Sequence, residues 1–175
     1  MINAHCRPQL TEITLAATED LTFSCIISSM NAVNFDKWRD TGSVFIATIL
    51  LDALANEFVH KAKGIAGLEK VVRYREMCKS LGLGCLGYHS YLQDNMIPFN
   101  SIEARMKNIE IFSHIEEESI KASEYVYECG GGAAIMKSYA ANHPEWTPRA
   151  HAHRCAVAPN VSSAVLAGQV SQGIE

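Results

Sequence analysis

Residues 81–87 read LGLGCLG, which puts glycine at positions 82, 84 and 87 of a chain of 175 residues. Glycine at alternate positions indicates that one side of the backbone has no room for a side chain. The three glycines also have the spacing of the GxGxxG dinucleotide-binding pattern, but no clear strand precedes them, so that pattern is weak evidence here. We therefore expect these glycines to serve close packing.

The composition is that of one ordinary globular domain. Hydrophobic residues make up 48% of the chain and charged residues 19%, and the formal net charge is −4 at pH 7. The scattered basic residues give no footprint for nucleic acid. No apolar run reaches the roughly 20 residues that span a bilayer, and the amino-terminal stretch lacks a signal-peptide pattern. We expect a cytoplasmic protein that binds neither a membrane nor nucleic acid.

The six cysteines, at positions 6, 25, 78, 85, 129 and 155, include no CxxC pair. Their spacing therefore indicates neither a zinc ribbon nor a thioredoxin-type site. In a reducing cytosol they should be mostly free thiols. We expect Cys78, Cys85 and Cys129 to be small buried hydrophobic residues.

The hydrophobic pattern predicts two short strands and two long helices. The strands are expected at 12–17 and 21–27, around a turn at Glu19-Asp20. One helix is expected from Val44 to Ala62, after the turn and cap residues at 40–43. The other begins after Ser101 and stops at the glycines of 130–132, and residues 138–154 read as a polar loop.

Helical spacing also predicts which face of each helix is buried. The apolar positions expected to face the core are Ile46, Ile49, Leu50, Leu54, Phe58 and Val59 in the first helix, and Ile102, Met106, Ile109, Phe112 (or Ile111) and Ile115 in the second. The acidic run at 116–118 is interpreted as a solvated face, with a carboxylate site as the alternative.

The stretch PNVSS at 159–163 is a candidate anion-binding loop. A strand that ends in this sequence can offer successive backbone N–H groups and serine hydroxyls to an anion. A helix that starts at Ser162 would add its free N–H groups. Many helix caps look alike, so an ordinary loop remains an open alternative.

Two other patterns have a possible chemical role. His151, His153 and Cys155 alternate, so in a strand they would line one face, and zinc accepts such ligands. No second ligand cluster matches them, and ordinary core or surface histidines are the alternative. Glu12 has uncharged neighbours, so partial desolvation would raise its pKa and suit a general base. The alternative is an edge-strand glutamate that faces water.

Four stretches, taken in order, carry a resemblance to a known family. They are LTEI (10–13), SCIISSMN (24–31), LGLGCLGYHSYLQ (81–93) and AVAPNVSSAVLAGQVSQGIE (156–175). Together with the helix SIEARMKNIEIFSHIEEESIKAS (101–123), they resemble the catalytic large (alpha) subunit of ribonucleotide reductase, nearest to the class I phage and bacterial forms.

The resemblance implies an α/β fold, here part of a ten-stranded α/β barrel over residues 10–175, with a non-matching segment at 1–9. That family makes 2′-deoxyribonucleotides for DNA replication by thiyl-radical chemistry. Glu12 matches the family's base at the ribose, and Cys25 matches one cysteine of the reducing pair. The residues that match the substrate phosphate loop are Pro159, Asn160, Val161, Ser162 and Ser163.

The resemblance also implies partners. The substrate would be a ribonucleoside diphosphate, and electrons would come from a thioredoxin or glutaredoxin-type reductant. The radical would come from a metal centre in a separate small subunit, so this chain is expected to bind no metal or cofactor itself.

The sequence departs from the family at the radical site. Leu10 stands where the radical cysteine is expected and Pro8 where an asparagine is usual, while Cys6 lies four residues before Leu10. Leucine forms no thiyl radical, so we expect little turnover from this chain alone. Either a second chain supplies the amino-terminal half, or the sequence is a partial reading of a longer gene. The alternative function is a non-catalytic, family-derived protein that binds nucleotide or a reductase subunit.

Overall fold

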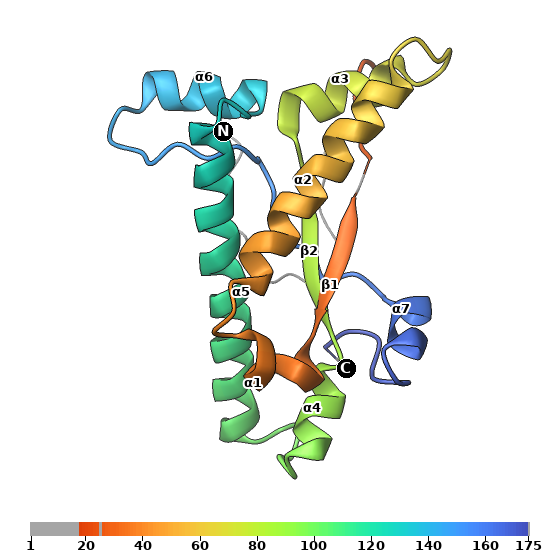
Figure 1. Ribbon diagram of the computed structural model, residues 1–175, viewed down its shortest axis with the longest axis vertical. Helices are drawn as coiled ribbons and strands as arrows, with labels where there is room; N and C mark the ends of the chain where they lie inside the picture. The colour runs from red at the N-terminus through yellow and green to blue at the C-terminus, as the bar shows by residue number, and fades with distance from the viewer. Residues whose placement is uncertain (1–17, 25, 175) are drawn as a thin grey trace.

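The computed structural model describes residues 18–24 and 26–174 (Figure 1). The elements, in order, are β1 (Ile27–Asn31), the 3-10 turn η1 (Ala32–Asn34), α1 (Phe35–Trp38), α2 (Ser43–Ala62), α3 (Glu69–Cys78), β2 (Gly82–Leu86), α4 (Tyr88–Asp94), α5 (Ile102–Glu128), α6 (Ala134–Asn142) and α7 (Val161–Leu166). The chain is therefore a mixture of helices and strands, as the sequence predicts.

The strands run parallel. β1 pairs with β2 so that Ile27 lies opposite Gly82 and Asn31 lies opposite Leu86. On the other edge of β2, Cys155 forms a parallel bridge with Leu83, and the Leu83 N–H donates to the Arg154 carbonyl at 2.8 Å. Because parallel neighbours need a long crossover, helices α1 to α3 fill the connection between β1 and β2.

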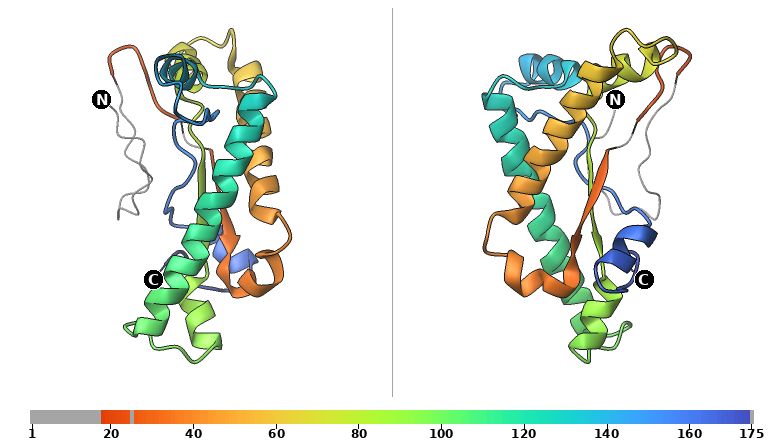
Figure 2. Two further views of the ribbon diagram at one scale, coloured as in Figure 1. Left: turned by 90° about the vertical axis from the view of Figure 1, so that its left-hand side faces the viewer. Right: turned by 45° about the vertical axis from the view of Figure 1, so that its right-hand side comes forward.

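The sheet has two different faces. On the helix face, Leu83 and Cys85 are buried in a core that includes Leu51 of α2 and Ile111 of α5. Figure 2 shows α2 and α5 on this side of the strands. Because side chains alternate along a strand, Ser29 and Gly84 point to the opposite face, which we call the loop face.

Helix α2 has nearly the predicted bounds but buries a different face. Ile46, Leu50 and Leu54 are 63%, 58% and 50% exposed, whereas Leu51 is 2% exposed. The predicted face is therefore wrong. α2 packs on α5, and the buried positions of both helices include small and polar residues: Thr48, Asp52 and Ala55 in α2, and Ser119, Ala122 and Ser123 in α5. Apolar periodicity cannot detect a contact of this composition.

Helix α5 starts as predicted, because the Ser101 side chain accepts a hydrogen bond from the Ala104 N–H at 3.0 Å. Its middle buries Ile111 and Ile115. The predicted face is wrong in the first two turns, where three apolar residues are exposed: Ile102, Met106 and Ile109. These turns extend beyond the strands beside α4 (Figure 1), so one side of the helix has nothing to pack against among the described residues.

Four other local predictions have different outcomes. The turn at Glu19-Asp20 is confirmed, because Thr18 and Leu21 exchange backbone hydrogen bonds around it. The strand predicted at 21–27 is wrong, since residues 21–24 are not extended in a sheet and β1 begins at Ile27, where pairing with β2 begins. The strand predicted at 12–17 lies outside the described residues. The predicted polar loop is wrong in its first part, because α6 continues to Asn142.

The predicted burial of cysteines is confirmed at two of three positions. Cys78 and Cys85 are buried, and burial raises the pKa of Cys85 to about 12. Cys129 is exposed because it lies where α5 ends, before the turn at Gly130. No disulfide joins the cysteines in the described part of the chain.

Among the described residues, α2 is the one helix long and apolar enough to cross a membrane, by length and composition only. It carries a buried, ion-paired Asp52 and packs against α5, as a core helix does. The expectation that the protein binds no membrane stays a prediction.

Candidate functional site

The predicted anion loop follows the third extended segment of the sheet. Residues 159–160 are irregular, and α7 begins at Val161, one residue before the predicted start. Since the segment at 154–156 runs parallel to β2, the loop lies toward the carboxyl ends of the strands. Open parallel sheets commonly bind ligands at this end.

The glycine at position 84 lets the chain before this loop approach the sheet. A Cβ at Gly84 would lie well inside 3.0 Å of the Ala156 carbonyl oxygen and 3.4 Å from the Ser29 hydroxyl. The predicted packing role is therefore confirmed for this glycine. Gly82 and Gly84 lie within β2, and Gly87 lies between β2 and α4.

Asn160 fixes the loop through its side chain. Its Oδ1 accepts a hydrogen bond from the Ser29 hydroxyl at 3.0 Å, and its Nδ2 donates to the carbonyls of Ala158 at 2.7 Å and Gln172 at 3.2 Å. The residue is 8% exposed. Its amide is thus occupied by the protein, whereas the side chains of Ser162 and Ser163 are exposed.

The chain that returns after α7 holds the loop from the other side. The backbone N–H of Asn160 donates to Gln172 at 3.1 Å, and the N–H of Gly87 donates to Ser171 at 2.8 Å. The Ser171 N–H in turn donates to the Ser90 hydroxyl at 2.9 Å. The loop is therefore joined to β1 through Ser29 and to the start of α4 through 171–172.

A buried cation also lies on the loop face. Arg154 alternates with Cys155, whose side chain packs on the helix face, so Arg154 points to the loop face. It is 6% exposed, and its Nε has no hydrogen-bond partner within the described residues. In the sequence, Arg154 falls in the predicted polar loop at 138–154 and was not predicted as a site residue. Its position between His153 and Cys155 was the one feature that could have indicated on which face it lies.

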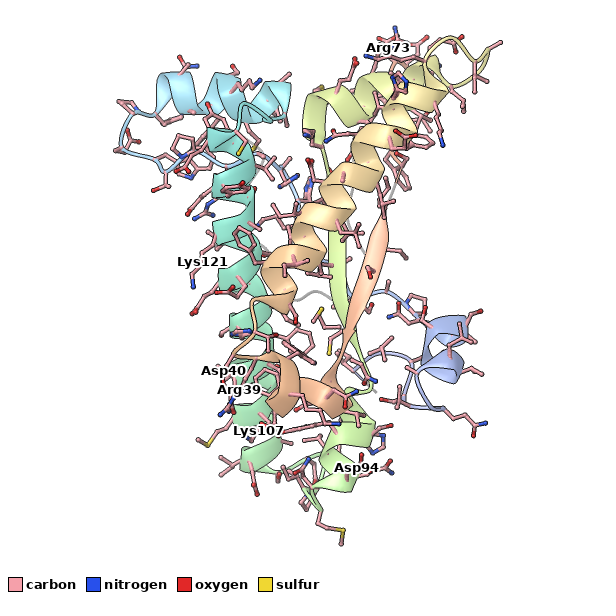
Figure 3. All side chains as sticks on the ribbon, in the orientation of Figure 1. Arg39, Asp40, Arg73, Asp94, Lys107 and Lys121 are labelled. Atoms are coloured by element: carbon pink, nitrogen blue, oxygen red, sulfur yellow. The ribbon has the colours of Figure 1, made fainter. Side chains whose placement is uncertain are left out.

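Most other charged groups lie away from the loop. Figure 3 shows Arg39, Asp40 and Lys107 beside α1 and the lower part of α5, on the opposite side of the view from α7. Arg39 pairs with Asp40 at 3.2 Å and Lys107 with Glu110 at 2.8 Å, and these side chains are partly to largely exposed. Such surface pairs contribute little to stability.

A second polar cluster joins α2, α5 and the segment before the loop. The His151 Nε2 lies 3.0 Å from the Asp52 Oδ1, and the His151 Nδ1 lies 2.9 Å from the Ser123 hydroxyl. The Lys79 Nζ approaches the same Asp52 oxygen at 2.9 Å. Asp52, Lys79 and Ser123 belong to no motif in the sequence and could not be predicted as a cluster, because they come together only in the fold.

This serine, histidine and aspartate have the composition of a hydrolase triad, but their environment is that of a structural clamp. The Ser123 oxygen accepts hydrogen bonds from the backbone N–H groups of Ala150 at 3.0 Å and His151 at 3.2 Å. We therefore infer that the Ser123 hydroxyl donates its hydrogen bond to the His151 Nδ1. The histidine then carries its proton on Nε2 and donates it in a hydrogen bond to Asp52. Ser123 and His151 are fully buried, so the serine is closed to a substrate.

The pKa values agree with a neutral histidine beside a charged aspartate. Burial alone would raise the pKa of Asp52, but hydrogen bonds from His151 and Lys79 outweigh it and lower that pKa to about 2. Burial lowers the pKa of His151, against the opposing effect of Asp52. The cluster therefore keeps one carboxylate charge, paired with Lys79, inside the fold.

The metal alternative for His151, His153 and Cys155 gains no support. Each of the three side chains already has a protein partner, and that of His151 is Asp52. The His153 Nδ1 lies 2.9 Å from the Ser80 hydroxyl, and the Cys155 sulfur lies 3.7 Å from the Ser119 hydroxyl. No group of three metal-ligating side chains occurs in residues 18–24 and 26–174.

The other residues predicted to have a chemical role are Glu12, Cys25 and the acidic run at 116–118. Glu12 and Cys25 lie outside the described residues. The solvated face predicted for the acidic run at 116–118 is confirmed at Glu117, which is exposed, whereas Glu116 is half-buried and Glu118 is 17% exposed and pairs with Lys121 at 2.6 Å.

Comparison with known proteins defines the class to which this fold belongs. The profile of the family described as "Ribonucleotide reductase, barrel domain" matches residues 10–145. The chain therefore belongs to the ribonucleotide reductase large-subunit family. The expected fold class, a partial barrel of the ribonucleotide reductase type, is confirmed by this match and by the solved structure described next. The boundary between 1–9 and 10–175 stays a prediction.

Individual relatives agree with this assignment. The alpha subunit of the class Id ribonucleotide reductase of Actinobacillus ureae superposes with a TM-score of 0.87 at 38% identity, over 94% of this chain and 30% of that one. The putative ribonucleoside-diphosphate reductase large subunit of Frog virus 3 is 35% identical over 159 residues, which are 90% of this chain and 26% of that protein. The large subunit of Invertebrate iridescent virus 3 is 29% identical over 173 residues, 94% of this chain and 25% of that protein. The chain thus spans about a quarter of the length of these two viral relatives.

Proposed function

We propose that this chain forms the nucleotide-facing part of the catalytic barrel of a ribonucleoside-diphosphate reductase large subunit. In that role it takes part in the reduction of ribonucleotides to 2′-deoxyribonucleotides for DNA synthesis. The observation that carries the proposal is the loop at 159–163, which is fastened against the loop face of the sheet in a member of this family.

The proposed roles follow the family's motifs. The loop binds the substrate's phosphates through the backbone N–H groups of residues 161–163 and through the exposed hydroxyls of Ser162 and Ser163. Asn160 contributes no donor of its own, because its backbone N–H donates to the Gln172 carbonyl and its side-chain amide is already occupied. Glu12 serves as base at the ribose. Cys25 is one of two cysteines that become a disulfide and deliver two electrons to the substrate.

The proposal implies other components. A separate small subunit supplies the radical from its metal centre, and a thioredoxin or glutaredoxin-type protein reduces the disulfide again. Because Leu10 occupies the position of the radical cysteine, that cysteine and the rest of the barrel must come from outside these 175 residues, for example from a second chain. The assembly works in the cytoplasm.

Leu10 also favours a second candidate function. A family member without its radical cysteine could bind nucleotide or a reductase subunit without catalysing reduction. The two functions share the phosphate loop and differ in whether an assembly that contains this chain reduces a ribonucleotide.

The first test is binding of inorganic pyrophosphate to the purified chain, measured by calorimetry. We expect binding that is weakened in the double variant Ser162→Ala/Ser163→Ala and unchanged in Ser138→Ala, a control on the exposed surface of α6. A wild-type chain that binds no pyrophosphate would contradict the assignment of the loop.

The second test is activity. We expect no reduction of a ribonucleoside diphosphate by the chain with a dithiol alone, and reduction when a chain with the remaining barrel and a small subunit are added. Turnover by the chain alone contradicts the need for other components. A stable assembly with no turnover supports the non-catalytic alternative.

A further inference from the structure

We infer that Ser29 is a positioning residue for the phosphate loop, and that it acts through the side chain of Asn160. The inference rests on the proposed function, because it assigns a role in phosphate binding to a residue remote from the proposed phosphate ligands. Ser29 lies in the middle of β1, and its hydroxyl donates to the Asn160 Oδ1 at 3.0 Å across the loop face.

The hydrogen bonds fix the orientation of the Asn160 amide. Its Nδ2 has two hydrogens, and two carbonyls receive them, those of Ala158 and Gln172. Oδ1 must therefore point to Ser29, and Ser29 must be the donor, because a carbonyl oxygen only accepts. Among the described residues, no other donor reaches this oxygen.

Asn160 is thus the point where three parts of the chain meet. The amide joins β1 through Ser29, the loop through Ala158, and the returning chain through Gln172. Residues 161–163 follow Asn160 directly, and these are the residues that the proposed function assigns to phosphate. A shift of the Asn160 side chain therefore moves them relative to the strands.

The close approach at Gly84 supports the same conclusion independently. The Ala156 carbonyl and the Ser29 hydroxyl both lie around the vacant side-chain position of Gly84. Because this space admits no side chain, Ser29 can reach across to Asn160. Gly84 in β2 leaves the space, and Ser29 in β1 makes the contact with Asn160.

The neighbouring serine is a matched comparison. Ser28 lies one residue earlier in the same strand, is exposed, and makes no hydrogen bond through its side chain within the described residues. Both residues lose the same hydroxyl when replaced by alanine. A difference between the two variants therefore reports the contact with Asn160.

The test measures the Kd for inorganic pyrophosphate and the thermal midpoint of each variant. We expect Ser29→Ala to raise Kd about fivefold, as loss of one hydrogen bond would, while Ser28→Ala leaves Kd unchanged. Ser29→Thr keeps the hydroxyl and should restore Kd to within about twofold of wild type. If Ser29→Ala does not fold, Ser29→Cys replaces it, since a thiol is a weaker donor and should also raise Kd.

The outcomes separate this inference from the proposed function. If wild type binds pyrophosphate and folded Ser29→Ala binds it equally well, Ser29 has no positioning role, although the loop assignment stands. If Ser29→Thr fails to restore binding, the hydroxyl is not the cause and the inference is overturned. If wild type binds no pyrophosphate, the loop assignment fails and the inference fails with it.

Discussion

The carbonyl oxygen of Ala156 lies against the backbone of Gly84, in the space that any larger residue at that position would fill with its Cβ. This contact brings the chain that leads to Asn160 directly over the central strand. It explains the glycine at position 84, because the loop could not take this position if that residue had a Cβ.

Replacing Gly84 with alanine should therefore disturb both stability and the loop. The atom in the way belongs to the backbone, so relief requires a shift of the main chain, and we expect a loss of about 1–3 kcal/mol in the free energy of unfolding. Denaturant unfolding measures this loss. Ser28→Ala, in the neighbouring strand, is the control and should change little. Equal stability of Gly84→Ala and wild type would show that the chain at Ala156 is not held there.

Adjacent leucines in α2 should respond very differently to a charge. Leu51 is buried in the core, whereas Leu50 is more than half exposed. We expect Leu51→Lys to unfold the chain, because it buries an unpaired ammonium. Leu50→Lys should change the free energy of unfolding by less than about 0.5 kcal/mol. Circular dichroism with thermal melts measures both variants. A larger loss of stability in Leu50→Lys than in Leu51→Lys would show that α2 buries the face that periodicity predicts.

Asp52 should make stability depend on pH in the acid range. Its pKa is about 2 in the folded chain and 3.8 as the reference value, so the folded state favours the charged form. The resulting stabilisation is present above about pH 4 and is lost as the pH falls toward 2; it amounts to up to about 2 kcal/mol. Asp52→Asn should flatten this part of the pH profile, as measured by denaturant unfolding at several pH values.

The control for that experiment is Asp40→Asn. Asp40 also pairs with a basic residue, Arg39, but on the surface, where such a pair contributes little. We expect its acid profile to follow wild type. If Asp52→Asn and wild type lose stability in parallel between pH 4 and 2, the buried pair with Lys79 and His151 is not the source.

Asn160 and Ser162 should separate folding from binding. Asn160→Ala removes an amide that makes three hydrogen bonds, and we expect it to cost about 1–3 kcal/mol of unfolding free energy. Ser162→Ala removes an exposed hydroxyl and should leave stability unchanged while it weakens pyrophosphate binding. A destabilised Ser162→Ala, or an unaffected Asn160→Ala, would reverse the two roles.

The sequence allowed prediction of features that depend on local chemistry. The approximate bounds of α2 follow from the turn residues before it and the glycine after it, and the start of α5 follows from the Ser101 cap. The family resemblance correctly predicted the barrel fold through motifs whose order and spacing are specific. These features need no knowledge of which segments meet in space.

The features that could not be predicted depend on contacts between distant segments. Asp52 lies on the buried face of α2, where His151 and Lys79 bind its carboxylate, and no local pattern shows this. The start of β1 depends on its pairing with β2. The sequence indicated a phosphate ligand at position 160, and only the hydrogen bonds in the fold show that the amide there is occupied.

The parallel pairing of β1 with β2 has a consequence for the time course of folding. The partners Ile27 and Gly82 are separated by the whole of α2 and α3, and Leu83 meets Cys155 only after α4, α5 and α6. Contacts of such long sequence separation form slowly, because the loop-closure entropy is lost before the contact is gained. We therefore expect the helices to form first and the sheet to follow. The loop at 159–163 takes its final position last, because it needs β1, β2 and the returning chain already in place.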